Sequence, residues 1–264
     1  MTETYQLYAV RYGHFHRNAA ANFVGGDPHD GPMPLDYFVW AIVGRSKTFI
    51  FDTGFDENVA QRRQRELVRP VGEGLKMMGI DPGKVDDVIL SHMHFDHCGN
   101  HDLFPRARYH VQDVEMAYCT GRCMCHEFLR HPFDVEDVTS MVAKLYAGRV
   151  KFHDGVSQIA PNLTVHRVGG HSKGLQVVRV LTDRGWVVLG SDASHFYANF
   201  EQYRPFPVLE SASEMLEGYD TMRELASSVQ HIVPGHDPLV LDRYPAALDG
   251  VNDIVRLDLE PISK

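Results

Sequence analysis

Four residues of the kinds that bind metals lie within six positions of the sequence. They are His92, His94, Asp96 and His97. The run directly follows residues 85–90, an apolar segment that predicts a short buried strand. Because side chains alternate along an extended chain, the first two histidines project to the same side, and a turn after them can bring the other two residues to a neighbouring point. Imidazole and carboxylate groups at this density are typical of sites for zinc and similar metals, and less so of a histidine-rich surface loop. The sequence therefore predicts a loop that serves two adjacent metal ions.

Three further metal-binding residues each follow a segment predicted as a strand. They are His171 after residues 163–168, Asp192 after residues 186–190 and His236 after residues 231–233. Taken alone, each fits a packed core or loop residue better than a metal ligand. Together they stand where strands end, so we expect them to meet the first loop at one edge of a sandwich of sheets.

The order of the predicted elements indicates an α/β fold with two similar halves. Strands are expected over residues 5–10, 37–43, 48–51, 85–90, 163–168, 175–181, 186–190 and 231–233, and helices over 56–78, 112–146 and 211–227. The second helical region is predicted to break near His131-Pro132, because proline cannot continue a hydrogen-bonded turn. We expect the halves to pack face to face, with two mixed β-sheets inside and helices outside. No linker interrupts the order, so residues 1–264 are predicted to form a single domain.

The charge of the chain limits its partners. The formal net charge is −9, and the longest basic cluster, Arg62, Arg63 and Arg65, is predicted to lie on a solvated helix face. Phosphate binding needs a basic stripe, so no nucleic-acid partner is expected. No segment approaches the roughly 20 apolar residues that cross a bilayer, and residues 1–4 do not begin an export signal. We therefore expect a cytoplasmic protein with no membrane partner.

The four cysteines do not form the spaced framework of a secreted disulfide domain. They are Cys98, Cys119, Cys123 and Cys125, three of them within seven positions. This spacing fits a reducing cytoplasm. The last three, with His126, can also be interpreted as a zinc cluster, although structural zinc sites usually take a second ligand pair from elsewhere in the chain. Thiols that simply pack are the expected alternative.

In order and spacing, the predicted ligands resemble the metal signature of the metallo-β-lactamase superfamily over nearly the whole chain. Phe51-Asp52-Thr53-Gly54 is similar to the early Asp-Thr-Gly turn of that family. The resemblance implies an αββα sandwich in which Asp52 orients a ligand histidine without binding metal; an ordinary turn carboxylate is the alternative. The ligand sets that it implies are His92, His94 and His171 for one metal, Asp96, His97 and His236 for the second, and Asp192 as the bridge.

Such a centre indicates hydrolysis. Two ions about 4 Å apart lower the pKa of a bridging water toward neutrality and stabilise charge on the attacking and leaving oxygens. The expected reaction is attack of a metal-bridging hydroxide on a carbonyl carbon, with Asp96 serving both as ligand and in catalysis. The expected cofactors are two divalent metal ions, with zinc first and manganese, iron or cobalt as alternatives that the same ligands accept.

Within the superfamily, residues 94–99 and 35–43 look most like the N-acyl homoserine lactonase group. That resemblance implies ring-opening of a lactone, a small-molecule substrate and a quorum-quenching role, with a homodimer left open. The group usually carries a tyrosine three residues after the bridging aspartate, where this chain has His195, with Tyr197 two positions further. Either side chain is predicted as the catalytic donor that polarises the carbonyl, with a packing role as the alternative.

Two other functions stay open. A hydrolase of the same fold could act on another small ester, a cyclic amide or a thioester, and the sequence does not separate these substrates. A metal-binding sensor without catalysis is more remote, because the carboxylates that hold and orient water are retained beside the histidines. The long segment 13–34 is predicted to line the mouth of the site.

Overall fold

The computed structural model describes residues 3–262, and in this range the larger of two sheets has nine strands. Eight follow the order β13-β14-β1-β2-β3-β5-β6-β7, and β4 pairs with β1 beside them. Pairing is parallel from β3 through β7 and antiparallel from β3 back to β13, so the sheet is mixed. The bounds are β1 Gln6–Phe15, β2 Leu35–Val43, β3 Thr48–Phe51, β4 Glu66–Leu67, β5 Asp87–Ile89, β6 Arg108–Gln112, β7 Val150–His153, β13 Ala246–Leu248 and β14 Val251–Arg256.

The smaller sheet has five strands in the order β12-β11-β10-β9-β8 within the same described residues. Its pairs are antiparallel except for β11 and β12, which run parallel because a long helical connection separates them. The bounds are β8 Val156–Ala160, β9 Leu163–Arg167, β10 Gln176–Thr182, β11 Gly185–Ser191 and β12 Ile232–Pro234.

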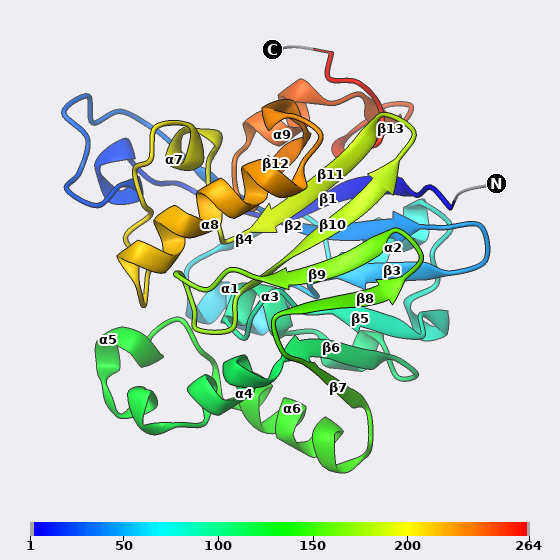
Figure 1. Cartoon of the computed structure of the whole chain (residues 1–264), viewed down its shortest axis with the longest axis horizontal. Helices are drawn as coiled ribbons and strands as arrows, with labels where there is room; N and C mark the ends of the chain where they lie inside the picture. Colours follow the sequence, from blue (N-terminus) through cyan, green and yellow to red (C-terminus); the bar gives the residue numbers. More distant parts are fainter. Residues whose placement is uncertain (1–2, 263–264) are drawn as a thin grey trace.

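Helices cover the outer faces of both sheets (Figure 1). The α-helices are α1 Glu57–Arg62, α2 Val71–Met77, α3 Phe95–Cys98, α4 Asp113–Cys119, α5 Glu127–Arg130, α6 Val135–Tyr146, α7 Tyr197–Glu201, α8 Ala212–Leu225 and α9 Leu239–Arg243. Short 3₁₀ turns are η1 Ala19–Asn22, η2 Pro82–Lys84, η3 His101–Leu103, η4 Arg122–Cys125 and η5 Val229–His231. Helix α8 packs on β11, α2 packs on β1, and α4 and α6 lie against β6 and β7. No helix within residues 3–262 combines the length and apolar character that crossing a membrane would need.

Alternation along β2 explains how the layers stack. Phe38, Trp40 and Ile42 belong to the core between the two sheets, which also contains the buried residues of β9 to β12 and of α8. Val39 and Ala41 point the opposite way, into a second core beneath α2 and α6. Side chains of a strand alternate between its two faces, so a strand that is apolar throughout must be buried on both faces. The predicted αββα sandwich is confirmed.

Several elements differ from the sequence prediction. The predicted helix over 56–78 is two short helices, because the chain between them forms β4 and pairs with β1 at Gly13 and His14. Strands β6, β7, β8, β13 and β14 were not predicted, since each is at most six residues long and too short for a clear period. The break near His131-Pro132 is present between α5 and α6.

Candidate metal centre

The seven predicted ligands converge at one edge of the sandwich. The donor atoms of His92, His94, His171 and Asp192 lie within 4.8 Å of one another, and so do those of Asp96, His97 and His236. A third group of the same kind joins Asp192, His195 and His236. Asp192 therefore stands between the two sets, with its carboxylate oxygens 3.0 Å from His171 Nε2 and 2.8 Å from His236 Nε2. This is the arrangement expected of a carboxylate that bridges two metals.

Strand ends place these side chains. The loop after β5 supplies His92 and His94, and α3 carries Asp96 and His97 one turn later. On the smaller sheet, parallel pairing of β11 with β12 puts the residues that follow both strands, Asp192 and His236, at the same edge. Gly235 permits this contact, because a Cβ there would lie 2.7 Å from the backbone of Ser191 and 2.9 Å from Asp192 Oδ1.

Hydrogen bonds behind the site orient the imidazoles. Asp52 lies 2.8 Å from His97 Nδ1 and also accepts from the backbone N–H and the hydroxyl of Ser91, at 2.7 and 2.8 Å. His236 Nδ1 lies 2.9 Å from the Asp36 carbonyl oxygen, and His171 Nδ1 lies 2.6 Å from the Val208 carbonyl oxygen. These contacts fix the Nδ1 atoms, so that Nε2 of each ring is left to face the centre. Asp52 takes the orienting position that the resemblance implied.

Two buried ring nitrogens of the predicted ligands have no hydrogen-bond partner among the described residues. They are His92 Nε2 and His97 Nε2. An unpaired buried polar atom costs about 1–3 kcal/mol, and a lone pair of this kind is satisfied when it coordinates a cation. All seven side chains are buried or nearly so. The residues present therefore fit divalent metal ions.

The pKa values of the predicted ligands shift in both directions. Burial alone would lower the pKa values of His97 and His236, but nearby carboxylates, Asp192 foremost, raise them. Burial holds the pKa values of His92 and His94 well below the usual range, with further lowering by neighbouring histidines. Both rings are therefore neutral, which is the form that binds metal. Burial alone would raise the pKa of Asp192, but the surrounding imidazoles, His195 and His97 foremost, keep it well below its ordinary value. The carboxylate is therefore ionised and available as a ligand.

The model of the metallo-beta-lactamase superfamily matches residues 33–242. The chain belongs to this superfamily. Among curated proteins, it is 28% identical over 165 residues to an N-acyl homoserine lactonase of Bacillus cereus, covering 62% of this chain and 60% of that protein. It is 28% identical over 176 residues to N-acyl homoserine lactonase AttM of Azorhizobium caulinodans, covering 65% of this chain and 64% of that one. The matched region thus spans less than two thirds of the length of these relatives.

A solved structure shares the fold. It is an N-acyl homoserine lactone hydrolase with the product N-hexanoyl-L-homoserine bound at the catalytic metal center. Its TM-score is 0.75 at 22% sequence identity, covering 92% of this chain and 96% of that chain. A dizinc quorum-quenching lactonase, AidC, aligns with a TM-score of 0.69 at 16% identity over 89% of this chain and 91% of its own. The metallo-β-lactamase fold of the chain is therefore established by sequence and by shape.

Within this metallo-β-lactamase fold, the two predicted donor residues lie in different places. His195 reaches the centre, with its Nε2 3.1 Å from Asp192 Oδ2. Its ring stacks on Phe206 with the centroids 3.5 Å apart, and its buried Nδ1 has no hydrogen-bond partner in the described part of the chain. The structure does not bring Tyr197 to the ligands. Its buried ring lies under the Arg243 guanidinium, 3.7 Å from it, within the core between the sheets. Tyr197 begins α7, and that helix turns its side chain inward.

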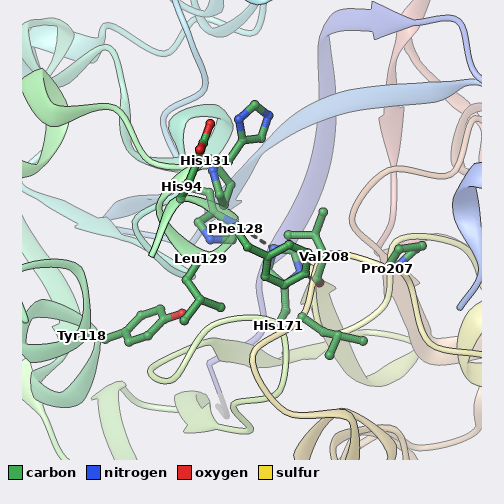
Figure 2. Close-up of a pocket in the computed structure, with 11 residues that line it drawn as sticks. His94, Tyr118, Phe128, Leu129, His131, His171, Pro207 and Val208 are labelled. Carbon is green, nitrogen blue, oxygen red and sulfur yellow. Dashed lines mark hydrogen bonds between the residues drawn. The ribbon is translucent and has the colours of Figure 1, made fainter. Parts of the chain in front are cut away.

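Two cavities open beside the ligands and share one wall. The larger, of about 400 Å³, is mostly apolar and is lined by Tyr118, Phe128, Leu129, Pro207 and Leu209, among others. The smaller, of about 160 Å³, is lined by five of the seven predicted ligands, all except His92 and His97, and by a polar wall of Tyr37, Arg17, Arg63 and Arg65. The residues common to both are His94, His131, Pro132, His171 and Val208. Figure 2 shows His94 and His171 beside the apolar side chains of the larger cavity.

The prediction of a solvated helix face for the arginine cluster is wrong. Helix α1 ends at Arg62, and only this arginine is mostly exposed. The chain then turns through Gln64, which has a φ of 55°, and this turn directs Arg63 and Arg65 into the smaller cavity. Segment 13–34 was predicted to line the mouth of the site. Of its residues, Arg17 lines the smaller cavity, and Met33 packs against the cluster that contains Phe206. The clustering of the arginines was visible in the sequence. The direction of their side chains was not, because it depends on where helix α1 ends.

The cysteines form no metal-binding group in the described residues, whose candidate groups contain only histidine and aspartate. All four are free, with Cys98 and Cys119 buried, Cys123 half-buried and Cys125 exposed. Cys98 and Cys119 pack in the core beneath α2 and α6. The interpretation as packing thiols fits the two buried residues.

Proposed function

We propose that this protein is a metal-dependent hydrolase that opens a lactone or a similar cyclic ester. The observation that carries the proposal is the pair of buried donor sets that meet at Asp192 and face two adjoining cavities of about 160 and 400 Å³. The curated relatives are named N-acyl homoserine lactonases, and one structural neighbour holds the ring-opened product N-hexanoyl-L-homoserine at its metal centre. A quorum-quenching role would follow if a homoserine lactone is the substrate.

The proposed cofactors are two divalent metal ions, with zinc the expected metal. His92, His94 and His171 would hold one ion and Asp96, His97 and His236 the other, with Asp192 shared. When bound, such ions polarise a carbonyl group and bring the pKa of water toward neutrality. The chain itself fixes the ligand rings through Asp52 and the carbonyl groups behind them.

His195 is the proposed donor to the substrate carbonyl. It stands three residues after Asp192, where the lactonase group carries its substrate-facing tyrosine, and it lines the smaller cavity. Stacking on Phe206 fixes the ring plane, so that the imidazole loses little freedom when a substrate binds. Tyr37 lines the same cavity, and its Oη accepts a hydrogen bond from Arg65 Nε at 2.8 Å. Its own proton is therefore directed away from Arg65, and Tyr37 offers a second donor.

The larger cavity supports an apolar substituent on the substrate. Tyr118, Phe128, Leu129 and Val208 surround a space next to His94 and His171 (Figure 2). Burial of an apolar chain there would contribute about 25 cal/mol for each Å² removed from water. An acyl group of moderate length is therefore the expected occupant.

The setting of the protein is proposed on separate grounds. Four free cysteines support a reducing cytoplasm, and the net charge of −9 supports a small-molecule partner over nucleic acid. The buried core between the sheets, which draws on strands from β1 to β14, supports one domain over residues 1–264. A homodimer stays open.

Metal content and turnover test the proposed function together. Purified protein is expected to hold close to two divalent ions by elemental analysis and to hydrolyse members of a panel of lactones, aryl esters, cyclic amides and thioesters. Asp192→Ala is expected to lower both occupancies, and His236→Ala to empty mainly one site, because Asp192 faces both ligand sets. Full activity with one ion or none would overturn the assignment. Two bound ions with no turnover across the panel would favour the metal-binding sensor.

A further inference from the structure

Three arginines line the cavity of the predicted metal ligands, and two of them, Arg17 and Arg65, come from distant parts of the chain. Arg17 precedes η1, and Arg65 lies between α1 and β4. Both line the cavity of about 160 Å³ that also contains Asp96, Asp192 and His236. Neither residue belongs to a ligand set, so the metal site alone does not account for them.

Arg17 and Arg65 have no carboxylate partner among residues 3–262, unlike the arginines around them. Arg62 and Arg63 both pair with Asp134 at 2.6 Å. Arg65 instead donates from Nε to Tyr37 Oη and from Nη1 to the Arg63 carbonyl oxygen, at 2.8 and 2.6 Å. Arg17 donates to the Ala21 carbonyl oxygen, and its buried Nε has no acceptor within the described residues. Two positive charges in this cavity therefore lack a counter-ion.

Aromatic rings hold both guanidinium groups in place. Arg65 lies over the Phe15 ring with its Cζ 3.7 Å from the centroid, and Arg17 lies 4.9 Å from the centroid of Phe206. Such stacking leaves the edges of the guanidinium fork free to donate hydrogen bonds. The two groups are thus positioned before any ligand arrives, which lowers the entropic cost of binding.

The charge balance of the cavity is positive. Burial lowers the pKa of Arg17, and the nearby charge of Arg65 lowers it further, against an opposing effect of Tyr37. The cavity contains two carboxylates, Asp96 and Asp192, and both are expected metal ligands. Two divalent ions would carry more positive charge than these two carboxylates neutralise. The chain as a whole has a net charge of −9, but the charge in this cavity is positive. The cavity is therefore expected to attract anions.

We propose that the substrate carries a carboxylate beside the bond that is cleaved, and that Arg17 and Arg65 bind this carboxylate. The inference rests on the proposed hydrolase function and narrows its substrate class. Guanidinium groups match a carboxylate in shape and bind it through charge-assisted hydrogen bonds. Because the two cavities share the wall of His94, His171 and Val208, the apolar part of the same substrate would lie on the other side of the reacting carbonyl.

A matched pair of lactones tests the proposal. One is a γ-butyrolactone ring with a carboxylate on the ring carbon beside the ring oxygen, and the other is its neutral carboxamide, which has nearly the same shape. The metal-loaded protein is expected to show a higher kcat/KM on the carboxylate. In Arg17→Gln and in Arg65→Gln, the ratio of the two kcat/KM values is expected to fall about ten- to a hundredfold, as for loss of a charged hydrogen bond. Lysine at either position should restore part of the ratio.

Arg62→Gln is the matched control, because Arg62 belongs to the same sequence cluster but is exposed and paired with Asp134. Its ratio is expected to equal that of the unchanged protein. A carboxamide that is hydrolysed as well as the carboxylate would overturn the proposal, and so would variants that lower both kcat/KM values equally.

Binding separates this inference from the proposed function. The ring-opened hydroxy diacid of the carboxylated lactone is titrated calorimetrically into the metal-loaded protein and into the double variant Arg17→Gln, Arg65→Gln. We expect at least tenfold weaker binding in the double variant, whether or not the protein hydrolyses either lactone. If neither lactone is hydrolysed but this difference is found, the lactonase assignment fails and the carboxylate site stands. Equal binding to both proteins would overturn the carboxylate site.

Discussion

Some side chains of the candidate metal centre could be predicted from the sequence, and others could not. Asp192, His171 and His236 could be predicted because each follows an apolar strand, and strands that share a sheet end at common edges. Arg65 could not, since its direction depends on the two-residue strand β4 and on the left-handed turn at Gln64. Nothing in the sequence favoured either His195 or Tyr197 as the donor to the substrate carbonyl. In the structure they differ because Tyr197 lies in α7 and His195 precedes this helix.

Cys98 allows a test of whether the reaction is covalent. It follows His97 directly, but its side chain is fully buried in the core beneath α2 and α6. A nucleophile needs access to substrate and a base in reach, and the neighbouring imidazoles face the centre. Cys98→Ala is therefore expected to keep kcat/KM within about tenfold, equivalent to less than ~1.4 kcal/mol of barrier.

The measurement is steady-state turnover with metal content checked for both proteins. In heavy-oxygen water, a single turnover should place the label in the product acid. A Cys98→Ala variant without activity but with both metals bound would require a covalent mechanism instead.

At the scale of elements, the contact between the ends of β11 and β12 determines the geometry of the centre. Strand β12 has three residues and β11 has seven, and their parallel pairing is consistent with the helix that separates them in the sequence. The edge strands β13 and β7, and β14 beside β13, could not be predicted, because their side chains are only partly buried and show no clear alternation. Strands were therefore predicted best where they are buried.

Gly235→Ala tests this contact. The added Cβ would lie 2.7 Å from Ser191 backbone atoms, closer than carbon atoms approach without displacement. We expect β12 to shift, with a loss of about 1–3 kcal/mol in the free energy of unfolding and a lower metal content. Gly31→Ala is the control, because its nearest neighbour would be a backbone oxygen 3.9 Å away. Denaturant titration measures the stability of each variant, and elemental analysis measures its metal content. Equal stability and equal metal content in the two variants would contradict the role of Gly235.

For the whole molecule, metal binding and folding are expected to be coupled. The predicted ligands come from loops that span His92 to His236, and only folding brings them together. Ions that bind only the folded state add their binding free energy to stability, about 2.7 kcal/mol at a concentration of a hundred times Kd. The melting temperature is therefore expected to drop clearly after chelation, measured by calorimetry with metal removal verified. An unchanged midpoint would mean that the sheets alone keep the ligand loops in place.

The pairing of β1 with β14 also bears on how the protein is made. Leu7 in β1 donates its backbone N–H to Asp258 Oδ1 at 3.1 Å, across 251 positions of sequence. The larger sheet therefore cannot be completed on the ribosome until almost the whole chain has emerged, although its inner strands are available early. Contacts of such long range slow folding and leave a sheet edge exposed while synthesis continues. Until the last strand arrives, the unpaired β1 edge would be open to pairing with other chains.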